Sequence, residues 1–368
     1  MRLRCSASCS PGLEPLVVAE LAEFGVRAGP TEPGLVPFTA TSRQLYTACL
    51  RSSVASRLLV QVAQFTARTF AALEREAAAV DWSPWTASGG TFRVTAVKSR
   101  LFHTKAVAER LERAAGGAGP TPFVVRVDHD RMTISADAGG DPLHRRGWRL
   151  ATAKAPLRPT LAAAALRTVG WDGTSPLIDP FCGSGTIAIE AAGLAAGLAA
   201  GRLRTFALEA WPSFAPGTWA SVAGEARAHA AATAQQLTPA AVLATDHDAG
   251  ACAATRGNAE RAGVHLAVRQ QQLSDLEPPA GPAGWLVANP PWGARTGAGA
   301  DLVDLHRLLG SIVRGRLAGW GVALLVADHH LARATGLPLR HRWSTPAGGT
   351  RVHLFASAAP GAGASMPT

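Results

Sequence analysis

The sequence DPFCGSGTIAIEAA, residues 179–192, joins a short apolar strand to a helix through a turn that contains two glycines. Gly183 and Gly185 allow the backbone of this turn to approach a ligand closely, because glycine has no Cβ and adopts left-handed conformations at little cost. Thr186 opens the helix, so the free N–H groups of the first helical turn point into the glycine turn. The stretch therefore predicts a ligand-binding strand–turn–helix unit of an α/β domain.

The same alternation of short apolar strands and alanine-rich helices continues beyond this unit. It predicts a doubly wound, mostly parallel sheet, which binds ligands at the carboxyl ends of its strands. An insertion of about residues 200–240, with Trp-containing turns, separates the first helix from the second strand. The predicted strands, in chain order, are SPLIDPF (175–181), AAVLATDHD (240–248), HLAVRQQ (265–271), GWLVANPP (284–291) and GVALLVAD (321–328).

An acidic residue ends each of the first two predicted strands. Asp179 comes directly before the glycine turn, and Asp246 ends the second strand in ATDHD. A carboxylate at Asp246 is placed to accept hydrogen bonds from both hydroxyls of a ribose. The neighbouring Asp248 is a second candidate, which also suits the cap of the following helix. S-adenosylmethionine fits this pattern, with its ammonium at Asp179, its carboxylate at backbone amides and its ribose at Asp246.

A nicotinamide dinucleotide is the competing ligand, because Gly183-x-Gly185-x-x-Ala188 also matches the dinucleotide fingerprint. That interpretation expects an acid about 20 positions further on, at a strand end. The first acid after the helix is Glu209, which lies in FALEAWP rather than at a clear strand end. The glycine turn alone is compatible with both a nicotinamide dinucleotide and S-adenosylmethionine. The acid at Asp246 favours S-adenosylmethionine.

The fourth predicted strand ends in ANPPWGA, residues 288–294, where an apolar strand runs into asparagine and two prolines. Proline rigidity fixes the side-chain oxygen of Asn289 and the backbone carbonyl of Pro290. Two convergent acceptors suit an amino group conjugated with a ring, because binding both hydrogens draws the lone pair out of the ring. Trp292 offers a stacking face, worth about 1–3 kcal/mol per base. Asn289, Pro290 and Trp292 are therefore the predicted catalytic residues, and positioning replaces a strong general base.

The front of the chain alternates strands and helices with antiparallel returns, which is typical of small α+β units. Its densest basic run is FRVTAVKSRLFHTKAVAERL, residues 92–111, at a strand-to-helix junction where phosphate is favoured. The connector DPLHRRGWRLATAKAPLRPTLAAAAL, residues 141–166, adds further arginines. The predicted RNA-binding residues are Arg93, Lys98, Arg100, Lys105, Arg145 and Arg146.

Composition supports a folded protein with a polyanionic partner. The net charge is +10 although charged residues make up only 17% of the 368 residues. Such a charge suggests nucleic acid, and a general compositional bias toward arginine is the alternative explanation. The five cysteines have no second pair or histidine at metal spacing, so reduced, packed thiols and no metal are expected. Without an apolar leader or a long apolar run, a cytoplasmic protein with no membrane partner is expected.

DPFCGSG, ATDHD and NPPW, in this order, resemble the motifs of class I S-adenosylmethionine-dependent methyltransferases that act on amino groups. The segments LHRRGWR, KAPLRPTLAAAAL and WPSF narrow the resemblance to THUMP-domain-containing guanine-N2 RNA methyltransferases, particularly the bacterial 23S ribosomal RNA type. The opening SCSPGLEPLVVAELAEFG is similar to the N-terminal ferredoxin-like segment of that family. The resemblance extends over residues 1–355.

The resemblance implies an α/β fold: a Rossmann-like class I methyltransferase domain preceded by an α+β ferredoxin-like and THUMP half. The implied segments are a ferredoxin-like segment at 1–60, a THUMP-like RNA-binding domain at 61–145, the methyltransferase domain at 146–356 and a disordered tail at 357–368. Asn289, Pro290 and Trp292 would hold the guanine amino group. The predicted cofactor contacts are Asp179, Phe181, Gly183, Gly185, Thr186, Asp246, His247, Gln272 and Asn289.

Two positions depart from the family pattern. Tyrosine is usual where Trp292 stands, so stacking is kept while any hydrogen bond from the tyrosine hydroxyl is lost or altered. An acid that contacts the adenine amino group is usual after the third strand, where QQQLSDL places Gln272. Gln272 can accept the same bond through its amide oxygen, and Asp275 is the alternative.

The sequence therefore predicts an enzyme that methylates the exocyclic N2 of a guanosine in RNA, with 23S ribosomal RNA preferred over tRNA. Adenine-N6 methylation of RNA or DNA and glutamine-N5 methylation of a protein use the same Asn-Pro-Pro logic and are the nearest alternatives. A non-catalytic RNA-binding assembly factor on the same scaffold, and an NAD(P) oxidoreductase, are the more distant ones.

Overall fold

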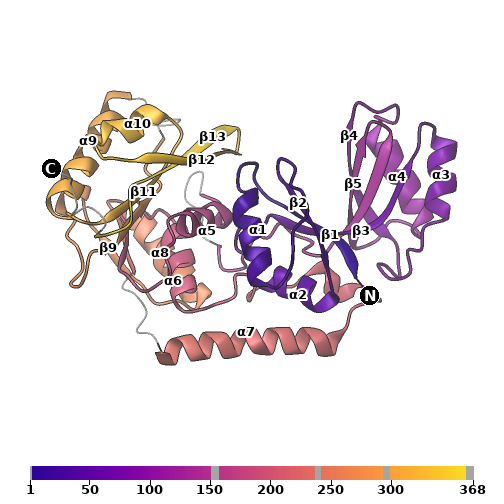
Figure 1. The fold of residues 1–368 in the computed structure, drawn as a ribbon, viewed down its shortest axis with the longest axis horizontal. Coiled ribbons are helices and arrows are strands. Elements are labelled where there is room, and N and C mark those ends of the chain that lie inside the picture. Colours follow the sequence, from indigo (N-terminus) through magenta and orange to yellow (C-terminus); the bar gives the residue numbers. More distant parts are fainter. Residues whose placement is uncertain (1, 151–156, 237–241, 293–298, 362–368) are drawn as a thin grey trace. The chain divides into compact units, whose positions relative to one another are not determined.

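The computed structural model describes residues 2–150, 157–236, 242–292 and 299–361 of the chain, which divide into two compact units (Figure 1). The first unit comprises Met1–Cys9, Val17–Leu143 and Arg204–Gly224. The second comprises Ser10–Leu16, His144–Leu203 and Glu225–Thr368. Each unit is built around one sheet.

The sheet of the first unit has six strands in the order β2-β1-β3-β6-β5-β4. Its neighbouring strands are antiparallel, apart from the parallel pair β4 and β5. The strands are β1 (Leu3–Ser8), β2 (Leu35–Ala40), β3 (Arg57–Thr66), β4 (Gly90–Val97), β5 (Thr121–Asp128) and β6 (Arg131–Asp137). The helices are α1 (Glu14–Glu23), α2 (Ser42–Arg51), α3 (Phe70–Ala78) and α4 (Thr104–Ala114).

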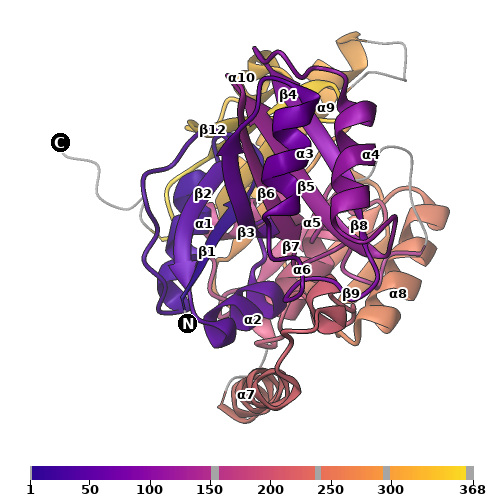
Figure 2. The same ribbon diagram turned by 90° about the vertical axis from the view of Figure 1, so that its right-hand side faces the viewer.

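Helices α3 and α4 lie on one face of this sheet, beside β4 and β5 (Figures 1 and 2). Both helices bury apolar residues at helical spacing, Leu73 and Ala77 in α3 and Val107 and Leu111 in α4. Such spacing gives each helix one apolar face, which the sheet covers.

The predicted boundary at residue 60 falls inside strand β3, so the predicted segments 1–60 and 61–145 share one sheet. Strand β2 had not been predicted from the sequence, because Pro37 interrupts its apolar pattern. It lies at the end of the strand order, and proline is tolerated in edge strands, where one row of backbone groups has no partner.

The sheet of the second unit has seven strands in the order β12-β13-β11-β10-β7-β8-β9. The strands from β11 to β9 are parallel, and β13 and β12 add an antiparallel edge. The strands are β7 (Leu177–Asp179), β8 (Val242–Asp246), β9 (Ala267–Gln270), β10 (Trp285–Ala288), β11 (Gly321–Val326), β12 (Arg340–Ala347) and β13 (Thr350–Ala356). The helices are α5 (Pro159–Thr168), α6 (Thr186–Ala195), α8 (Ala249–Ala262), α9 (Gly299–Gly315) and α10 (His329–Ala334).

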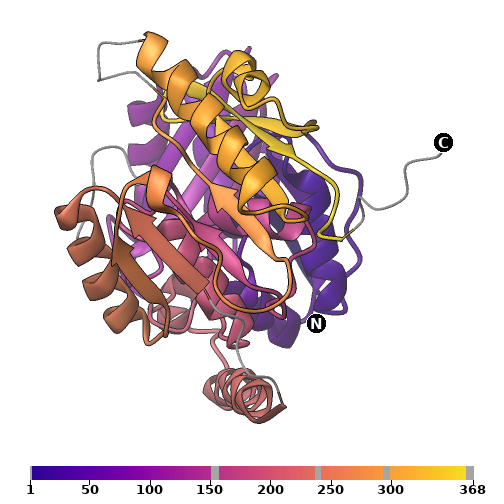
Figure 3. The same cartoon turned by 90° about the vertical axis from the view of Figure 1, so that its left-hand side faces the viewer.

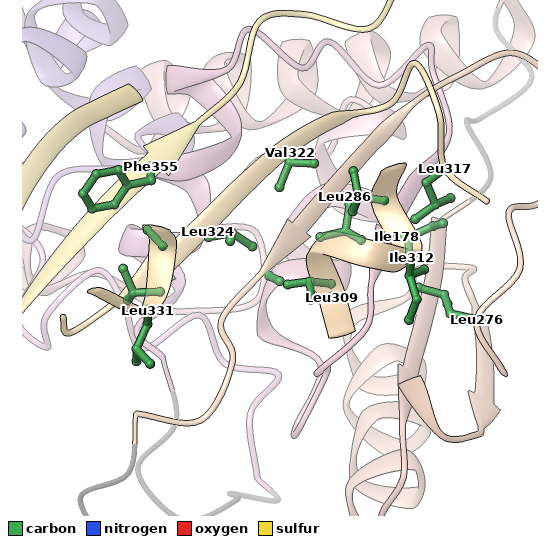
Figure 4. Packing of buried hydrophobic residues seen from close by; sticks show 14 of the residues in the cluster. Ile178, Leu276, Leu286, Leu309, Ile312, Leu317, Val322, Leu324, Leu331 and Phe355 are labelled. Atoms are coloured by element: carbon green, nitrogen blue, oxygen red, sulfur yellow. The ribbon is translucent and has the colours of Figure 1, made fainter. Parts of the chain in front are cut away.

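Helices cover both faces of this sheet: α5, α6 and α8 lie on one side, and α9 and α10 lie on the other (Figures 1 and 3). On the α9 side, Leu309 and Ile312 of α9 pack with Leu286 of β10 and Leu324 of β11 in one buried cluster (Figure 4). The predicted doubly wound α/β fold is confirmed. Strands β10 and β11 are apolar along their whole length because both of their faces are buried.

The five predicted strands of this sheet correspond to β7–β11. The prediction of Trp-containing turns in the insertion was wrong at Trp219, which lies in helix α7 (Pro216–Gln236). Of the predicted disordered tail, residues 362–368 lie outside the described residues. All five cysteines are free and buried, which confirms the expectation of packed thiols.

Candidate active site

The sheet of the second unit brings three predicted polar residues to one edge. Asp179 ends β7, Asp246 ends β8 and Asn289 directly follows β10. These strands are neighbours in the order β10-β7-β8 and run parallel, so their carboxyl ends lie at the same edge. The chain turns to opposite sides of the sheet after β7 and after β10, and such a switch point is where open α/β sheets bind ligands.

The glycine turn between β7 and α6 is held against the end of β8. The N–H of Cys182 donates to the carbonyl of Thr245 (3.0 Å), and the N–H of Gly183 donates to Oδ2 of Asp246 (3.0 Å). Both glycines have left-handed backbone angles, with φ of 52° at Gly183 and 86° at Gly185. A Cβ on Gly185 would lie 2.9 Å from a methyl group of Thr255. The turn therefore requires glycine for its backbone conformation and for its packing.

Two buried side chains of helix α8, which the sequence interpretation missed, fix the glycine turn from behind. The hydroxyl of Thr255 donates to the carbonyl of Gly183 (3.0 Å), and Nδ2 of Asn258 donates to the carbonyl of Ser184 (2.9 Å). Both residues are fully buried. Their spacing of three residues places them on one helix face, which is the sequence signal that points to them.

Asp179 is a buried acid, with 1% of its surface exposed. Burial raises the pKa of its carboxyl from 3.8 to about 8; the N–H of Phe181 acts in the opposite direction and Asp246 raises the pKa further. The N–H of Phe181 lies 3.3 Å from Oδ1 of Asp179. The carboxyl therefore holds a proton at neutral pH until a cation approaches it.

Asp246 lies in a more polar environment. Its Oδ1 accepts from the N–H of Asp248 (3.1 Å) and lies 3.2 Å from Nδ1 of the exposed His247. Asp248 caps helix α8 by accepting from the N–H of Gly250 (2.8 Å), which is the second of the two roles that the sequence left open for it. Each carboxylate oxygen of Asp246 has two lone-pair sites, so the group retains capacity to accept ligand hydroxyls.

The Asn-Pro-Pro-Trp segment combines an unsatisfied acceptor with an anchored ring. Oδ1 of Asn289 is buried and has no hydrogen-bond partner within the residues that the structure describes, and Pro290 is buried. The indole N–H of Trp292 donates to the carbonyl of Leu325 on the neighbouring strand β11 (3.1 Å). This bond anchors the indole ring to β11.

Two glutamines follow strand β9, where the sequence predicts the contact to adenine. Gln272 is exposed and precedes a short 3-10 turn, Leu273–Asp275, in which Asp275 is also exposed. The preceding Gln271, which the sequence interpretation passed over, donates its N–H to the carbonyl of Asp246 (3.0 Å). Its Nε2 is buried, and none of the described residues accepts a hydrogen bond from it. Gln271 therefore offers a free donor close to the ribose candidate.

The connector before α5 supports the glycine turn from its other end. The hydroxyl of Thr186 accepts from Arg149 and donates to the carbonyl of Leu157 (3.4 Å). Thr186 therefore has protein partners for its side chain, and its backbone N–H belongs to the free first turn of α6.

Arg146 does not lie at the surface. Only 2% of the residue is exposed, and its Nε and Nη2 each lie 3.1 Å from a carboxylate oxygen of Glu190 on α6. The prediction that Arg146 contacts RNA was wrong, because a guanidinium buried in a bidentate ion pair cannot reach a phosphate. Arg145, directly before it, is exposed.

The remaining predicted RNA contacts lie in the first unit. Arg93 is exposed on β4, Lys98 and Arg100 are exposed in the loop that follows β4, and Lys105 is exposed in the first turn of α4. The structure thus places three of these cations within one loop and the helix turn that follows it.

In the described part of the chain, no helix is long and apolar enough to cross a membrane. Within the same residues, no group of three or more histidine, cysteine, aspartate or glutamate side chains is arranged to hold a metal ion.

Comparison with known proteins matches both parts of the chain. Residues 146–344 match the family described as RMKL-like, methyltransferase domain, and residues 4–59 match the RlmL ferredoxin-like domain. The chain is 34% identical to the ribosomal RNA large subunit methyltransferase K/L of Syntrophotalea carbinolica, over 90% of this chain and 50% of the relative. The chain thus spans about half the length of the curated relatives that it matches.

Two solved structures share the fold over nearly the whole chain. A possible methylase from Clostridium difficile 630 has a TM-score of 0.89 and 25% identity, with 100% of each chain covered. A putative methyltransferase complexed with SAH has a TM-score of 0.87 and 25% identity, with 97% of this chain and 98% of the other covered.

Proposed function

Because the chain belongs to the RMKL-like methyltransferase family, we propose that it transfers a methyl group from S-adenosylmethionine to the exocyclic N2 of a guanosine in RNA. The preferred substrate is 23S ribosomal RNA, in line with the name of the Syntrophotalea relative. The enzyme would act in the cytoplasm, with RNA as its partner.

The observation that carries this proposal is the free acceptor on Asn289. Its Oδ1 is buried and has no partner among the described residues, and native proteins rarely leave a buried polar atom in that state. An amino group of a planar base would satisfy it, and the ring of Trp292, which is anchored to Leu325, would offer that base a stacking face. The acceptor lies at the same sheet edge as Asp179 and the glycine turn, so the target amino group and the cofactor site share one edge.

The residues at this edge fit S-adenosylmethionine. Asp179 would bind the ammonium, since a nearby cation favours ionisation of its carboxyl, and the turn at Gly183–Gly185 would receive the carboxylate. Asp246 would accept from the ribose hydroxyls, and Gln271 or Gln272 would contact the adenine. When bound, the cofactor supplies a methyl group on a positively charged sulfur, which is an electrophile.

The contribution of the protein to the reaction is to position and polarise the target amino group. Asn289 Oδ1 and the Pro290 carbonyl would accept the two amino hydrogens, which concentrates the nitrogen lone pair for attack. Trp292 would fix the plane of the base by stacking. Rigid placement of reacting groups, together with preorganised acceptors, accounts for large rate effects without a strong base.

A direct test measures methyl transfer from tritiated S-adenosylmethionine to RNA, followed by mass spectrometry of the nucleosides. We expect N2-methylguanosine in ribosomal RNA taken from a strain that lacks the gene, and loss of transfer in Asn289→Ala with RNA binding retained. N6-methyladenosine as the product, or transfer to tRNA alone, would replace the proposed substrate. The absence of S-adenosylmethionine binding would contradict the proposal altogether.

A further inference from the structure

The loop between β4 and α4 exposes an aromatic ring. In the described part of the chain, five large apolar side chains are exposed, and Phe102 (63%) and Val97 (51%) are two of them. Phe102 is the aromatic one of the five, and its ring lies 4.1 Å from that of the exposed His103, between centroids. An exposed aromatic side chain lacks the burial that normally stabilises it, so its position can indicate an interaction site.

The backbone around Phe102 is held in an unusual conformation. Among the described residues, the non-glycine residues with positive φ are Lys98 (46°), His129 (49°) and Asp130 (64°). All three lie in this loop or in the adjacent β5–β6 turn. His129 and Asp130 are the two central residues of the β5–β6 hairpin, where positive φ is the favoured turn geometry, whereas the conformation of Lys98 costs on the order of 1–3 kcal/mol.

Hydrogen bonds join the two turns and fix this conformation. The N–H of His129 donates to the carbonyl of Val97 (3.2 Å), and the N–H of Asp130 donates to the hydroxyl of Ser99 (3.1 Å). Oδ1 of Asp130 accepts from the N–H of Arg100 (2.7 Å). The loop is therefore an ordered support that keeps Phe102 at the surface.

Positive charge surrounds the ring. Lys98, Arg100 and Lys105 are exposed, and no carboxylate pairs with their side chains within the described residues. The two nearby acids have cationic partners already: Asp130 pairs with Arg68 (3.2 Å), and Asp128 pairs with Arg126 (3.1 Å). The loop therefore presents an exposed aromatic ring together with cations that have no acidic partner among the described residues.

Single-stranded RNA is the partner that uses both features. A base offers a flat face to the ring, and the phosphates on either side offer negative charge to the lysines and arginine. In a paired helix the bases already stack on one another, so their faces are not open to Phe102.

We propose that Phe102 stacks on an unpaired nucleotide of the RNA substrate, with Lys98 and Arg100 holding the adjoining phosphates. This inference rests on the proposed function, because it names the form of RNA that the same enzyme recognises. It predicts that the substrate carries a loop, bulge or single-stranded end.

The test measures binding of a fluorescein-labelled single-stranded oligoribonucleotide, and of a fully paired duplex, by anisotropy at several salt concentrations. Phe102→Ala should weaken single-strand binding by about 5- to 150-fold. It should leave duplex binding and the salt dependence unchanged, because stacking releases no counterions. Lys98→Ala should instead make the fall of the logarithm of the binding constant with the logarithm of salt concentration shallower, by about 0.7 in slope.

Two control variants accompany the test. Phe102→Trp should restore single-strand binding, since the larger ring keeps the stacking face. Leu308→Ala, at an exposed apolar residue on α9 in the second unit, should have no effect. Because both side chains are exposed, unchanged melting temperatures are expected for all of these variants.

The outcomes separate this inference from the proposed function. Single-strand binding that is the same in Phe102→Ala and the parent protein, or an equal loss on duplex, overturns the stacking role even if methyl transfer proceeds. A stacking signature without methyl transfer to any RNA leaves the inference standing and removes the proposed activity. If the parent protein binds no RNA, or if an acidic polypeptide competes with RNA at equal charge concentration, the inference fails.

Discussion

Asp179 carries a high electrostatic cost in the proposed cofactor site, because its carboxyl lies in the interior at the end of β7. Its sequence position pointed to ligand binding, but its burial depends on packing that the sequence does not display. Trp292 shows the same limit of prediction from sequence, here for a single hydrogen bond. The sequence predicted its stacking face, whereas its anchor at Leu325 depends on the neighbouring strand β11, 33 residues further along the chain.

We expect Asp179→Asn to stabilise the unliganded protein increasingly as the pH rises. Because the folded-state pKa, about 8, lies above the ordinary 3.8, the native protein keeps a proton that the unfolded chain releases between these values. The stability that Asp179 contributes is therefore fully present below pH 3.8 and is lost as the pH rises through about 8. Between these values, the difference in unfolding free energy between the variant and the parent should grow by up to about 1.4 kcal/mol per pH unit. Urea unfolding of both proteins across this pH range measures the difference, and a difference that does not change with pH would contradict the prediction.

Trp292→Phe keeps an aromatic face but removes the N–H that donates to Leu325. We expect kcat to fall about 2- to 10-fold, which corresponds to one neutral hydrogen bond, with cofactor affinity unchanged. Steady-state kinetics together with calorimetric titration of S-adenosylhomocysteine separates the two quantities. An unaltered kcat would show that the anchor does not position the base.

At the scale of elements, helix α8 acts as the support of the glycine turn, since Thr255 and Asn258 bond to two successive carbonyls of that turn. Sequence periodicity found α8 itself but assigned no role to its inner face. Strands β7, β8, β10 and β11 could be predicted because their apolar runs stop at an acid or at Asn-Pro. Strands β12 and β13 and helix α7 were missed because their sequences mix polar and small residues without a clear apolar period.

Thr255→Val tests the support role of α8. The variant keeps the shape of the side chain but leaves the carbonyl of Gly183 without its buried donor, which costs about 1–3 kcal/mol. We expect lower thermal stability and weaker cofactor binding. Thr255→Ser keeps the hydroxyl and is the matched control, so it should retain most of the cofactor affinity. Equal affinity in the valine variant and the parent would assign Thr255 to packing alone.

At the scale of the whole molecule, the order of motifs along the chain predicted two parts with different chemistry, and the family matches fall at 4–59 and 146–344. The limit of such prediction is illustrated by Arg146. Arginine is usually exposed, and its partner Glu190 lies 44 residues away on another element. Only the assembled fold shows that this cation belongs to the interior.

Acid is expected to destabilise the second unit through its histidines. Burial lowers the pKa of His144 from 6.5 to about 4, with further lowering by Arg158 and its arginine neighbours. Burial also lowers the pKa of His306 and of His353, and the latter faces His329, His341 and Arg351, with Asp328 acting in the opposite direction.

Because these folded-state pKa values lie below the ordinary 6.5, the unfolded chain takes up protons that the native protein does not. The stability that these histidines contribute is fully present above pH 6.5 and is lost as the pH falls toward about 4. The melting temperature should therefore drop through this window, although Asp179 opposes the drop. His144→Gln should show a smaller drop than the parent, and a drop of equal size would exclude His144 as a contributor.

The buried carboxyl of Asp179 also makes cofactor loading a proton-exchange event. A group with a pKa of about 8 is protonated at neutral pH in the unliganded protein, and the proposed pairing with an ammonium would expel that proton into the solvent. The measured heat of binding would then contain the ionisation enthalpy of the buffer. Titrations in phosphate and in Tris at one pH would give different heats for the same affinity, and the difference would count the protons released with each cofactor bound.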